Sequence, residues 1–376
     1  MSALRVLIVQ PWLDWRGAET QSIQLVEDLQ RLGIESKLVC LFVRQAANVE
    51  SIRSSLLLPH PFLQRLLRKR VVFSVFSLPV LCYLLLRYGR DFSVFNPHNF
   101  PSVWAAGLVA HILRKRVVWT AHNFPQHPFR GIWQVTFELC IKKIDAIIVR
   151  RCSAIIAVSR KVARQVKDFY QCGAHVIYPA LNESYYLNLE LRRAVYKGME
   201  NIPENATVLL HCGRVCAEKM QQFTLDVFSR LTLTNPQLYL VFAGSGDVSN
   251  LCIDRCSDRV VFLGFVEKHE LVSVYARSQI LIHPSSYGEG CTMVPFEAIA
   301  SGTQKVMLAD GAGADELLNN LTECVIFKPT DGVESAAELL RTLITRPIDH
   351  HEMVLPSNVK REFMTARYKE VFESVL

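Results

Sequence analysis

Short apolar runs alternate with amphipathic stretches along most of the chain. Leu4–Val9 is an apolar run, and after a turn-like segment apolar side chains recur at three- and four-residue spacing as far as Leu32. Gly33 stands where a helix C-cap is expected, and the apolar run Lys37–Val43 predicts a second strand. The order strand, helix, strand predicts a parallel α/β domain.

The same alternation starts again in the second half. Further strands are predicted at 92–96, 117–120, Ala154–Val158, Thr207–His211, Leu238–Ala243, Val260–Leu263 and Gln279–His283. Residues 179–204 show no clear period and are expected to form a linker. The 376 residues fit two domains. We therefore predict an α/β protein with two doubly wound, Rossmann-like domains, 1–178 and 205–350, that face each other across a cleft, followed by a C-terminal segment, 351–376.

One apolar stretch, residues 71–86, carries no charge. Basic side chains flank it on both sides: Arg65, Arg68, Lys69, Arg70, Arg87 and Arg90. A spanning helix needs about 20 apolar residues, and this stretch is shorter and contains Pro79. A buried core helix and a basic, apolar helix that docks on an anionic leaflet are the two favoured interpretations, and a membrane span is the third.

The net charge of +7 hides a difference between the halves. Residues 1–178 carry 24 basic and 10 acidic side chains, whereas the remainder carries 18 and 25. A basic first half indicates an anionic partner there, which would be a membrane surface, a phosphorylated substrate or nucleic acid. The alternative is that these charges only keep the surface hydrated and bind no partner. The odd count of 11 scattered cysteines favours a reducing compartment, and the run Ser2–Val9 is too short for a signal peptide.

Glu289 and Glu297 stand on either side of a glycine-containing loop, directly after the predicted strand Gln279–His283. Pro295 suits the first turn of a helix, so Glu297 is expected in that turn and Glu289 in the loop before it. Backbone N–H groups at a helix start bind phosphate, and carboxylates accept hydrogen bonds from sugar hydroxyls. Together these features favour a nucleotide sugar as ligand.

A second group of candidate residues follows the predicted strand Thr207–His211. Gly213 lets the backbone turn close to a ligand, Arg214 offers planar donors for a diphosphate, and Lys219 adds a point charge. An ordinary surface turn would explain these residues taken alone, but it is disfavoured beside the glutamate pair. No Asp-x-Asp pair occurs in the sequence, which disfavours a diphosphate held by a metal ion.

At these residues the sequence resembles glycosyltransferase family 4, the retaining transferases of the GT-B fold. Glu289 and Glu297 match the family's paired glutamates, and Gly213, Arg214 and Lys219 match its diphosphate-binding residues. The likeness covers nearly the whole chain and is loosest between 40 and 95. Residues 291–293 depart from the family's usual loop, which leaves the donor preference open.

The resemblance implies a role for several residues. Glu289 would bind the donor hexose, Glu297 the ribose, and Arg214 and Lys219 the departing diphosphate. His122 would close the site from the first domain, whereas a structural role is favoured for His98, one strand earlier. Catalytic roles are thereby expected for His122, Glu289, Arg214 and Lys219, and donor-binding roles for Gly17, Gly213, Arg214, Lys219, Phe265, Val266, Glu289, Thr292, Met293, Val294 and Glu297.

The expected activity is therefore that of a retaining, metal-independent hexosyltransferase. It would move sugar from a UDP- or GDP-sugar to a glycan or lipid-linked acceptor, in cell-envelope polysaccharide or lipopolysaccharide synthesis. We expect no cofactor and no nucleic-acid partner, and a cytoplasmic protein that touches the inner face of the membrane through residues 60–90. The C-terminal helix within 351–376 would return to the first domain, as in that fold. A sugar-nucleotide epimerase of the same fold and a non-catalytic nucleotide-sugar-binding subunit are the alternatives.

Overall fold

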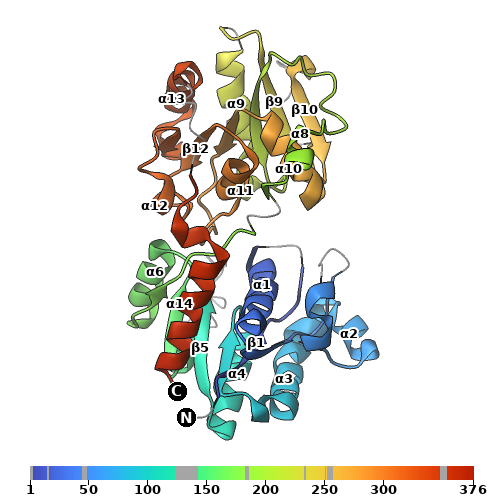
Figure 1. Cartoon of the computed structure of the whole chain (residues 1–376), viewed down its shortest axis with the longest axis vertical. Helices are drawn as coiled ribbons and strands as arrows, with labels where there is room; N and C mark the ends of the chain where they lie inside the picture. The colour runs from blue at the N-terminus through green and yellow to red at the C-terminus, as the bar shows by residue number, and fades with distance from the viewer. Residues whose placement is uncertain are drawn as a thin grey trace, which may run out of the picture. The chain divides into compact units, whose positions relative to one another are not determined.

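The computed structural model describes the chain except residues 1–2, 15–16, 45–48, 124–142, 183–185, 233, 250, 252–256 and 348–353. The chain folds into two compact units (Figure 1). The first unit is Met1–Ala180 together with Arg361–Leu376, and the second unit is Leu181–Lys360. Each is built around a parallel sheet.

In the first unit, the described strands pair in the order β3-β2-β1-β4-β5-β6-β7. Their bounds are β1 Arg5–Val9, β2 Glu35–Val39, β3 Leu56–Leu57, β4 Val94–Pro97, β5 Arg116–Ala121, β6 Ala154–Ala157 and β7 His175–Val176. The helices are α1 Gly17–Arg31, α2 Pro61–Leu67, α3 Arg70–Tyr88, α4 Ser102–Leu113, α6 Arg160–Tyr170 and α14 Arg361–Ser374. The order reverses between β1 and β4, and in such sheets ligands bind beyond the carboxyl ends of the strands at that point.

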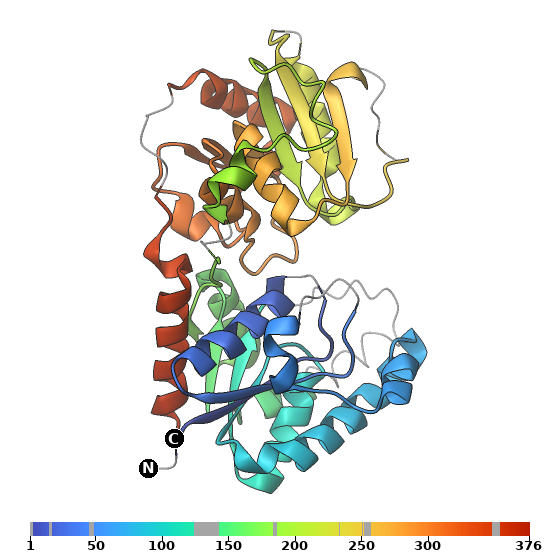
Figure 2. The same ribbon diagram turned by 45° about the vertical axis from the view of Figure 1, so that its right-hand side comes forward.

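Helices cover both faces of this sheet, which is why its strands are continuously apolar (Figure 2). Side chains of β1 alternate between the faces: Val6 and Ile8 pack with α1 and α14, and Leu7 and Val9 pack with α3 and α4. The segment Arg361–Leu376 thus completes the core of the first unit.

The second unit repeats the design, with described strands in the order β10-β9-β8-β11-β12-β13. They are β8 Thr207–Cys212, β9 Leu238–Ala243, β10 Val260–Gly264, β11 Ile280–His283, β12 Lys305–Ala309 and β13 Cys324–Phe327. The helices are α8 Leu189–Arg193, α9 Gln221–Leu231, α10 Lys268–Arg277, α11 Val294–Ser301, α12 Asp315–Leu318 and α13 Val333–Thr345. Helices α9 and α13 pack on one face, and α10 and α11 on the other. The order reverses between β8 and β11.

Two boundaries differ from the sequence-based expectation. The strand expected at Lys37–Val43 is Glu35–Val39. The Cys40 N–H still bonds the Leu57 carbonyl of β3, but the Leu41 N–H bonds the Pro11 carbonyl instead, so the strand does not continue to Val43. The linker expected at 179–204 contains α8, and Tyr186, Met199 and Ile202 are buried in the second unit. Apolar side chains without a regular period still pack when irregular backbone covers a sheet.

Helix α3 is not a buried core helix. Only Ser77, Leu81, Leu84 and Leu85 of its 19 residues are buried, and the three leucines pack in the core with Leu7 and Val9 of β1. Among the described residues, Arg70–Asp91 is the helix long and apolar enough to cross a membrane, with 22% of its apolar window buried. One such helix is weak evidence for a span.

Candidate active site

The loop after β8 is fixed by its own backbone and by one glutamine. Gly244, with φ +146°, lies so close to this loop that a Cβ there would be 2.0 Å from the carbonyl oxygen of Gly213. The buried Gln221 donates from Nε2 to the Arg214 carbonyl at 2.7 Å and accepts from the Cys216 N–H at 3.3 Å. The loop is therefore held in one shape, and it projects the Arg214 side chain into solvent. Within the described residues that guanidinium has no ion-pair partner.

Lys219 and Glu289, which are both expected to bind the sugar donor, contact each other. The Lys219 ammonium donates to Glu289 Oε1, and both side chains are about four-fifths buried. His283, at the end of β11, places Nε2 3.9 Å from the same oxygen. Burial, reinforced by the charge of Lys219, lowers the pKa of His283 to about 3, so this ring is neutral. The loops after β8 and β11 thus meet at the switch point of the second sheet.

The helix that follows Glu289 begins where the sequence predicted. Helix α11 starts at Val294 with Pro295 in its first turn, and Glu297 lies in that turn. No side chain caps its N-terminus, and the N–H groups of a helix start are donors suited to a phosphate. The preceding loop is pinned by Gly313, with φ +82°, where a Cβ would lie 2.2 Å from the Gly290 carbonyl oxygen.

Two tyrosines that sequence reasoning missed hold Glu297. Tyr186 donates to Oε1 at 2.8 Å, and Tyr275 donates to Oε2 at 3.1 Å. Tyr275 OH also lies 3.3 Å from Cys212 Sγ, which ties Glu297 to the end of β8. Burial raises the pKa of Tyr275 well above 10, so it stays a donor. No spacing rule could have found these contacts, because they join residues 111 and 22 positions apart.

The remaining donor-binding candidates of the second unit lie at strand or helix ends. Phe265 and Val266 directly follow β10, the first exposed and the second buried. Thr292 is buried and its N–H donates to the Ala312 carbonyl at 3.1 Å, while Met293 and Val294 form the start of α11. Within the described residues, no three His, Cys, Asp or Glu side chains form a group that could hold a metal ion.

Gly17 and His122 belong to the first unit. Gly17 begins α1, and a Cβ there would meet nothing within 4 Å, so the backbone has open space beside it. His122 follows β5 and contacts His98, which follows β4: Nε2 of His122 lies 2.7 Å from Nδ1 of His98. Burial lowers the pKa of His122 to about 4. Both histidines therefore stand neutral at the carboxyl ends of their strands.

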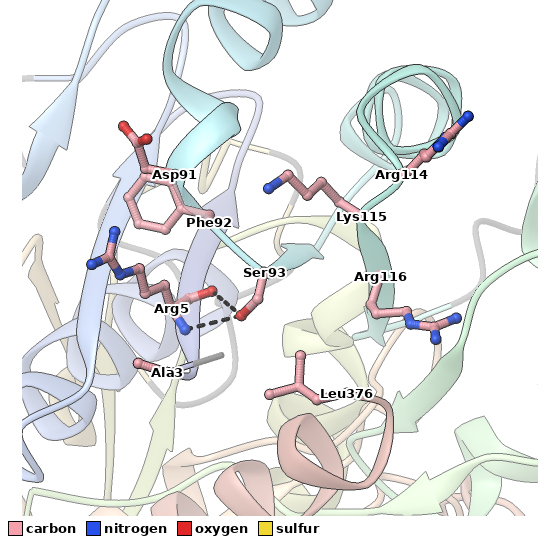
Figure 3. Close-up of a pocket in the computed structure, with 9 residues that line it drawn as sticks. All are labelled: Ala3, Arg5, Asp91, Phe92, Ser93, Arg114, Lys115, Arg116 and Leu376. Carbon is pink, nitrogen blue, oxygen red and sulfur yellow. Dashed lines mark hydrogen bonds between the residues drawn. The ribbon is translucent and has the colours of Figure 1, made fainter. Parts of the chain in front are cut away.

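A hollow of about 530 Å³ lies at the opposite end of the same sheet (Figure 3). Arg5, Ser93 and Arg116, at or just before the amino ends of β1, β4 and β5, line it together with Arg114 and Lys115. The guanidinium groups of Arg5, Arg114 and Arg116 point in different directions, and Lys115 donates to the Arg90 carbonyl at 2.5 Å. These cations do not converge on one ligand position, so this hollow is not the candidate site.

Family models match both units. Residues 15–185 match the model described as Glycosyltransferase Family 4, and residues 193–355 match Glycosyl transferases group 1. An uncharacterised glycosyltransferase of Methanocaldococcus jannaschii is 24% identical over 230 residues, which span 58% of each chain. A GDP-mannose-dependent alpha-(1-6)-phosphatidylinositol dimannoside mannosyltransferase of Mycobacterium tuberculosis is 25% identical over 145 residues, 38% of this chain and 37% of that one.

Solved structures match over nearly the full length. Anabaena Alr3699/HepE in complex with UDP and glucose is 15% identical, with a TM-score of 0.68 over 99% of this chain and 97% of that one. The lipopolysaccharide outer core galactosyltransferase WaaB is 13% identical, with a TM-score of 0.69 over 99% of this chain and 100% of that one. These likenesses confirm the two-domain, Rossmann-like GT-B fold. With paired glutamates, a Gly-Arg loop and a lysine at the switch point of its second sheet, the chain belongs to glycosyltransferase family 4, the group 1 glycosyl transferases.

Proposed function

We propose that the protein transfers a hexose-type sugar from a UDP- or GDP-sugar to a glycan or lipid-linked acceptor, with retained anomeric configuration and without a metal ion. The observation that carries this proposal is the contact between Lys219 and Glu289 at the neighbouring ends of β8 and β11. Arg214 lies exposed in the same loop after β8 as Lys219 and has no ion-pair partner in the described part of the chain. The relatives support it, since one is named as GDP-mannose-dependent and one structure holds UDP and glucose.

The proposed roles follow from charge and position. Arg214 and Lys219 stabilise the negative charge that grows on the diphosphate as the glycosidic bond breaks. Glu289 accepts hydrogen bonds from the donor hexose, and Glu297 accepts them from the ribose while its two tyrosines hold it in place. Because both carboxylates are assigned to binding, the acceptor hydroxyl would attack on the face from which the diphosphate leaves. For His122 and Gly17 of the first unit, donor-binding roles are proposed as well.

A thermal-shift panel of UDP-, GDP-, ADP-, TDP- and CMP-sugars in the presence of EDTA tests the donor site. A ligand that binds only the folded protein raises its Tm. We expect one donor class to raise it, and Arg214→Ala and Glu297→Ala to abolish that rise. Arg230→Ala and Glu334→Ala are matched controls, since these residues form an exposed ion pair in the same unit. A shift that requires added metal, or one that survives both site substitutions, would contradict the proposal.

We further propose that α3 holds the enzyme on an anionic membrane, at the inner face of the cytoplasmic membrane. Its outward face is apolar: Val71, Val75 and Phe76 are 78%, 61% and 52% exposed, and Tyr83 and Leu86 continue this face. The opposite face packs on the sheet through Leu81, Leu84 and Leu85. Cations lie at both ends of this helix: Arg65, Arg68, Lys69, Arg70, Arg87 and Arg90. Apolar insertion combined with attraction to anionic lipid suits such a surface.

Cosedimentation with vesicles tests this surface. We expect the protein to bind vesicles that contain anionic lipid, to bind neutral vesicles weakly, and to lose binding in the double variant Val75→Asp/Phe76→Asp. Phe169→Asp is the control, because Phe169 is an equally exposed aromatic residue on α6 of the same unit. Binding that ignores anionic lipid, or that survives the double substitution, would rule out this docking surface.

A further inference from the structure

A pair of stacked histidines lies at the switch point of the first sheet. His98 is 1% exposed, and its ring stacks on that of His122 with centroids 4.9 Å apart. Their facing nitrogens, Nδ1 of His98 and Nε2 of His122, are 2.7 Å apart. At that distance one proton must lie between two neutral rings, and either ring could carry it.

Asn96 decides which ring carries that proton. Its Nδ2 donates to the Val118 carbonyl at 2.6 Å, and because a carbonyl only accepts, the amide orientation is fixed. Asn96 Oδ1 therefore faces Nε2 of His98 at 2.9 Å, so this Nε2 must be protonated. A neutral His98 then has a bare Nδ1, which accepts from the Nε2–H of His122.

The neighbouring polar groups agree with this direction. Ser22 Oγ lies 3.2 Å from the same Nδ1, but it donates to the Ala18 carbonyl at 2.9 Å. Thr120 Oγ1 accepts from Asn96 Nδ2 at 3.0 Å and from Tyr368 OH at 3.4 Å, which links the chain of hydrogen bonds to α14. Burial and the neighbouring ring lower the pKa of His98 well below its usual value, so it stays neutral.

We propose that His98 is a positioning residue that fixes His122 in the Nε2–H form and so leaves its Nδ1 bare, as an acceptor for a hydroxyl of the donor sugar. The sugar ligand in this proposal rests on the proposed function, whereas the tautomer of His122 does not. His122 Nδ1 has no hydrogen-bond partner among the described residues. A ring free to change tautomer would present an N–H there in part of the molecules and repel a donor hydroxyl hydrogen.

Histidine ¹⁵N NMR of the full chain tests the tautomer without any ligand. We expect His122 to show a protonated Nε2 and a bare Nδ1 at pH 7, and the His98→Leu variant to show a mixture of tautomers. In His98→Asn, the amide oxygen stands two bonds from Cβ, as Nδ1 does, and should restore the Nε2–H form. A protonated Nδ1 on His122 in the wild type, or a tautomer unaffected by His98→Leu, would overturn the proposal.

Kinetics then test the consequence. With the donor that raises Tm, His98→Leu should lower kcat/KM about tenfold, the value of one lost hydrogen bond, and His98→Asn should recover most of it. Tyr368→Phe, at the far end of the chain of hydrogen bonds, should have a smaller effect. If the tautomer changes as expected while kcat/KM does not, His98 positions His122 but His122 does not contact the donor, and the ligand part of the proposal fails.

Discussion

Lys219 and Glu289 form an ion pair, and both are assigned to the donor. Replacing Lys219 by Met removes a charged donor from the diphosphate and leaves Glu289, which is largely buried, without its cation. A charged hydrogen bond contributes about 1.5–3 kcal/mol, so the affinity for the donor's nucleoside diphosphate should fall roughly 10- to 100-fold. Isothermal titration calorimetry measures this. Lys197→Met, an exposed lysine of the same unit, is the control, and equal affinity in both variants would remove Lys219 from the site.

Buried neutral histidines make the second unit acid-sensitive. The pKa of His283 is about 3 and that of His211 is well below 6.5, in both cases mainly through burial. Below about pH 6.5 these histidines bind protons in the unfolded chain but not in the folded protein. The free energy of unfolding therefore falls as the pH drops from 6.5 toward 3. Each such ring should cost about 1.4 kcal/mol between pH 7.5 and 5.5.

Amide hydrogen exchange at pH 7.5 and 5.5 measures this loss of stability in peptides from β8 and β11, the strands that contain His211 and His283. His283→Leu should make the loss smaller by about 1.4 kcal/mol, because the leucine takes up no proton in either state. An unchanged pH dependence in that variant would show that His283 is protonated in the folded protein.

For single residues, the sequence predicted those positions that depend on neighbours along the chain. Glu297 was placed in the first turn of its helix because Pro295 marks that turn, and the structure agrees. Tyr186 and Tyr275, which hold Glu297, could not be predicted, since an aromatic residue in an apolar stretch carries no sign of where its hydroxyl points. The site roles themselves stay predictions.

At the scale of elements, α14 depends on one largely buried arginine, Arg361. Arg361 donates to Asp28 at 2.6 and 3.0 Å and to Glu27 at 2.8 Å, both on α1. Arg361→Met would leave Glu27 without its cation and Asp28 with only the exposed Arg31, 3.2 Å away. The loss of this largely buried partner should cost about 3 kcal/mol in the first unit. Urea unfolding followed by tryptophan fluorescence reports on this unit, because all five tryptophans lie between Trp12 and Trp133.

The same helix provides the control for this measurement. Arg367→Met removes an exposed pair with Glu370 on α14 itself and should cost less than about 1 kcal/mol. Equal losses in the two variants would mean that α14 is not anchored through Arg361.

Elements were predictable where burial on both faces makes a strand continuously apolar. Strand β9 was predicted with its observed bounds. The two-residue strands β3 and β7 are too short for any period. Strand β12 begins with Lys305, which is buried because its ammonium donates to three carbonyls at the C-terminal end of α13. From the sequence alone, a lysine disfavours a buried strand at that position, because its carbonyl partners on α13 are known only from the structure.

At the scale of the whole molecule, both units use one design. Each parallel sheet reverses its strand order once, between β1 and β4 or between β8 and β11. The polar residues that sequence and structure single out follow these strands or their neighbours: His98 and His122 in the first unit, and Arg214, Lys219 and Glu289 in the second. The charge asymmetry of the sequence indicates an anionic partner for the first unit. In our proposal this partner is the membrane that α3 contacts.

The most direct test of the central claim is the configuration of the product. The protein is incubated in EDTA with the donor that raises Tm, and ¹H NMR identifies the sugar first released to an acceptor or to water. An α-linked donor should give the α-anomer first, with Arg214→Ala inactive. The β-anomer first would contradict retention, a nucleotide sugar of altered configuration would identify an epimerase, and no turnover with bound donor and a range of acceptors would indicate a non-catalytic subunit.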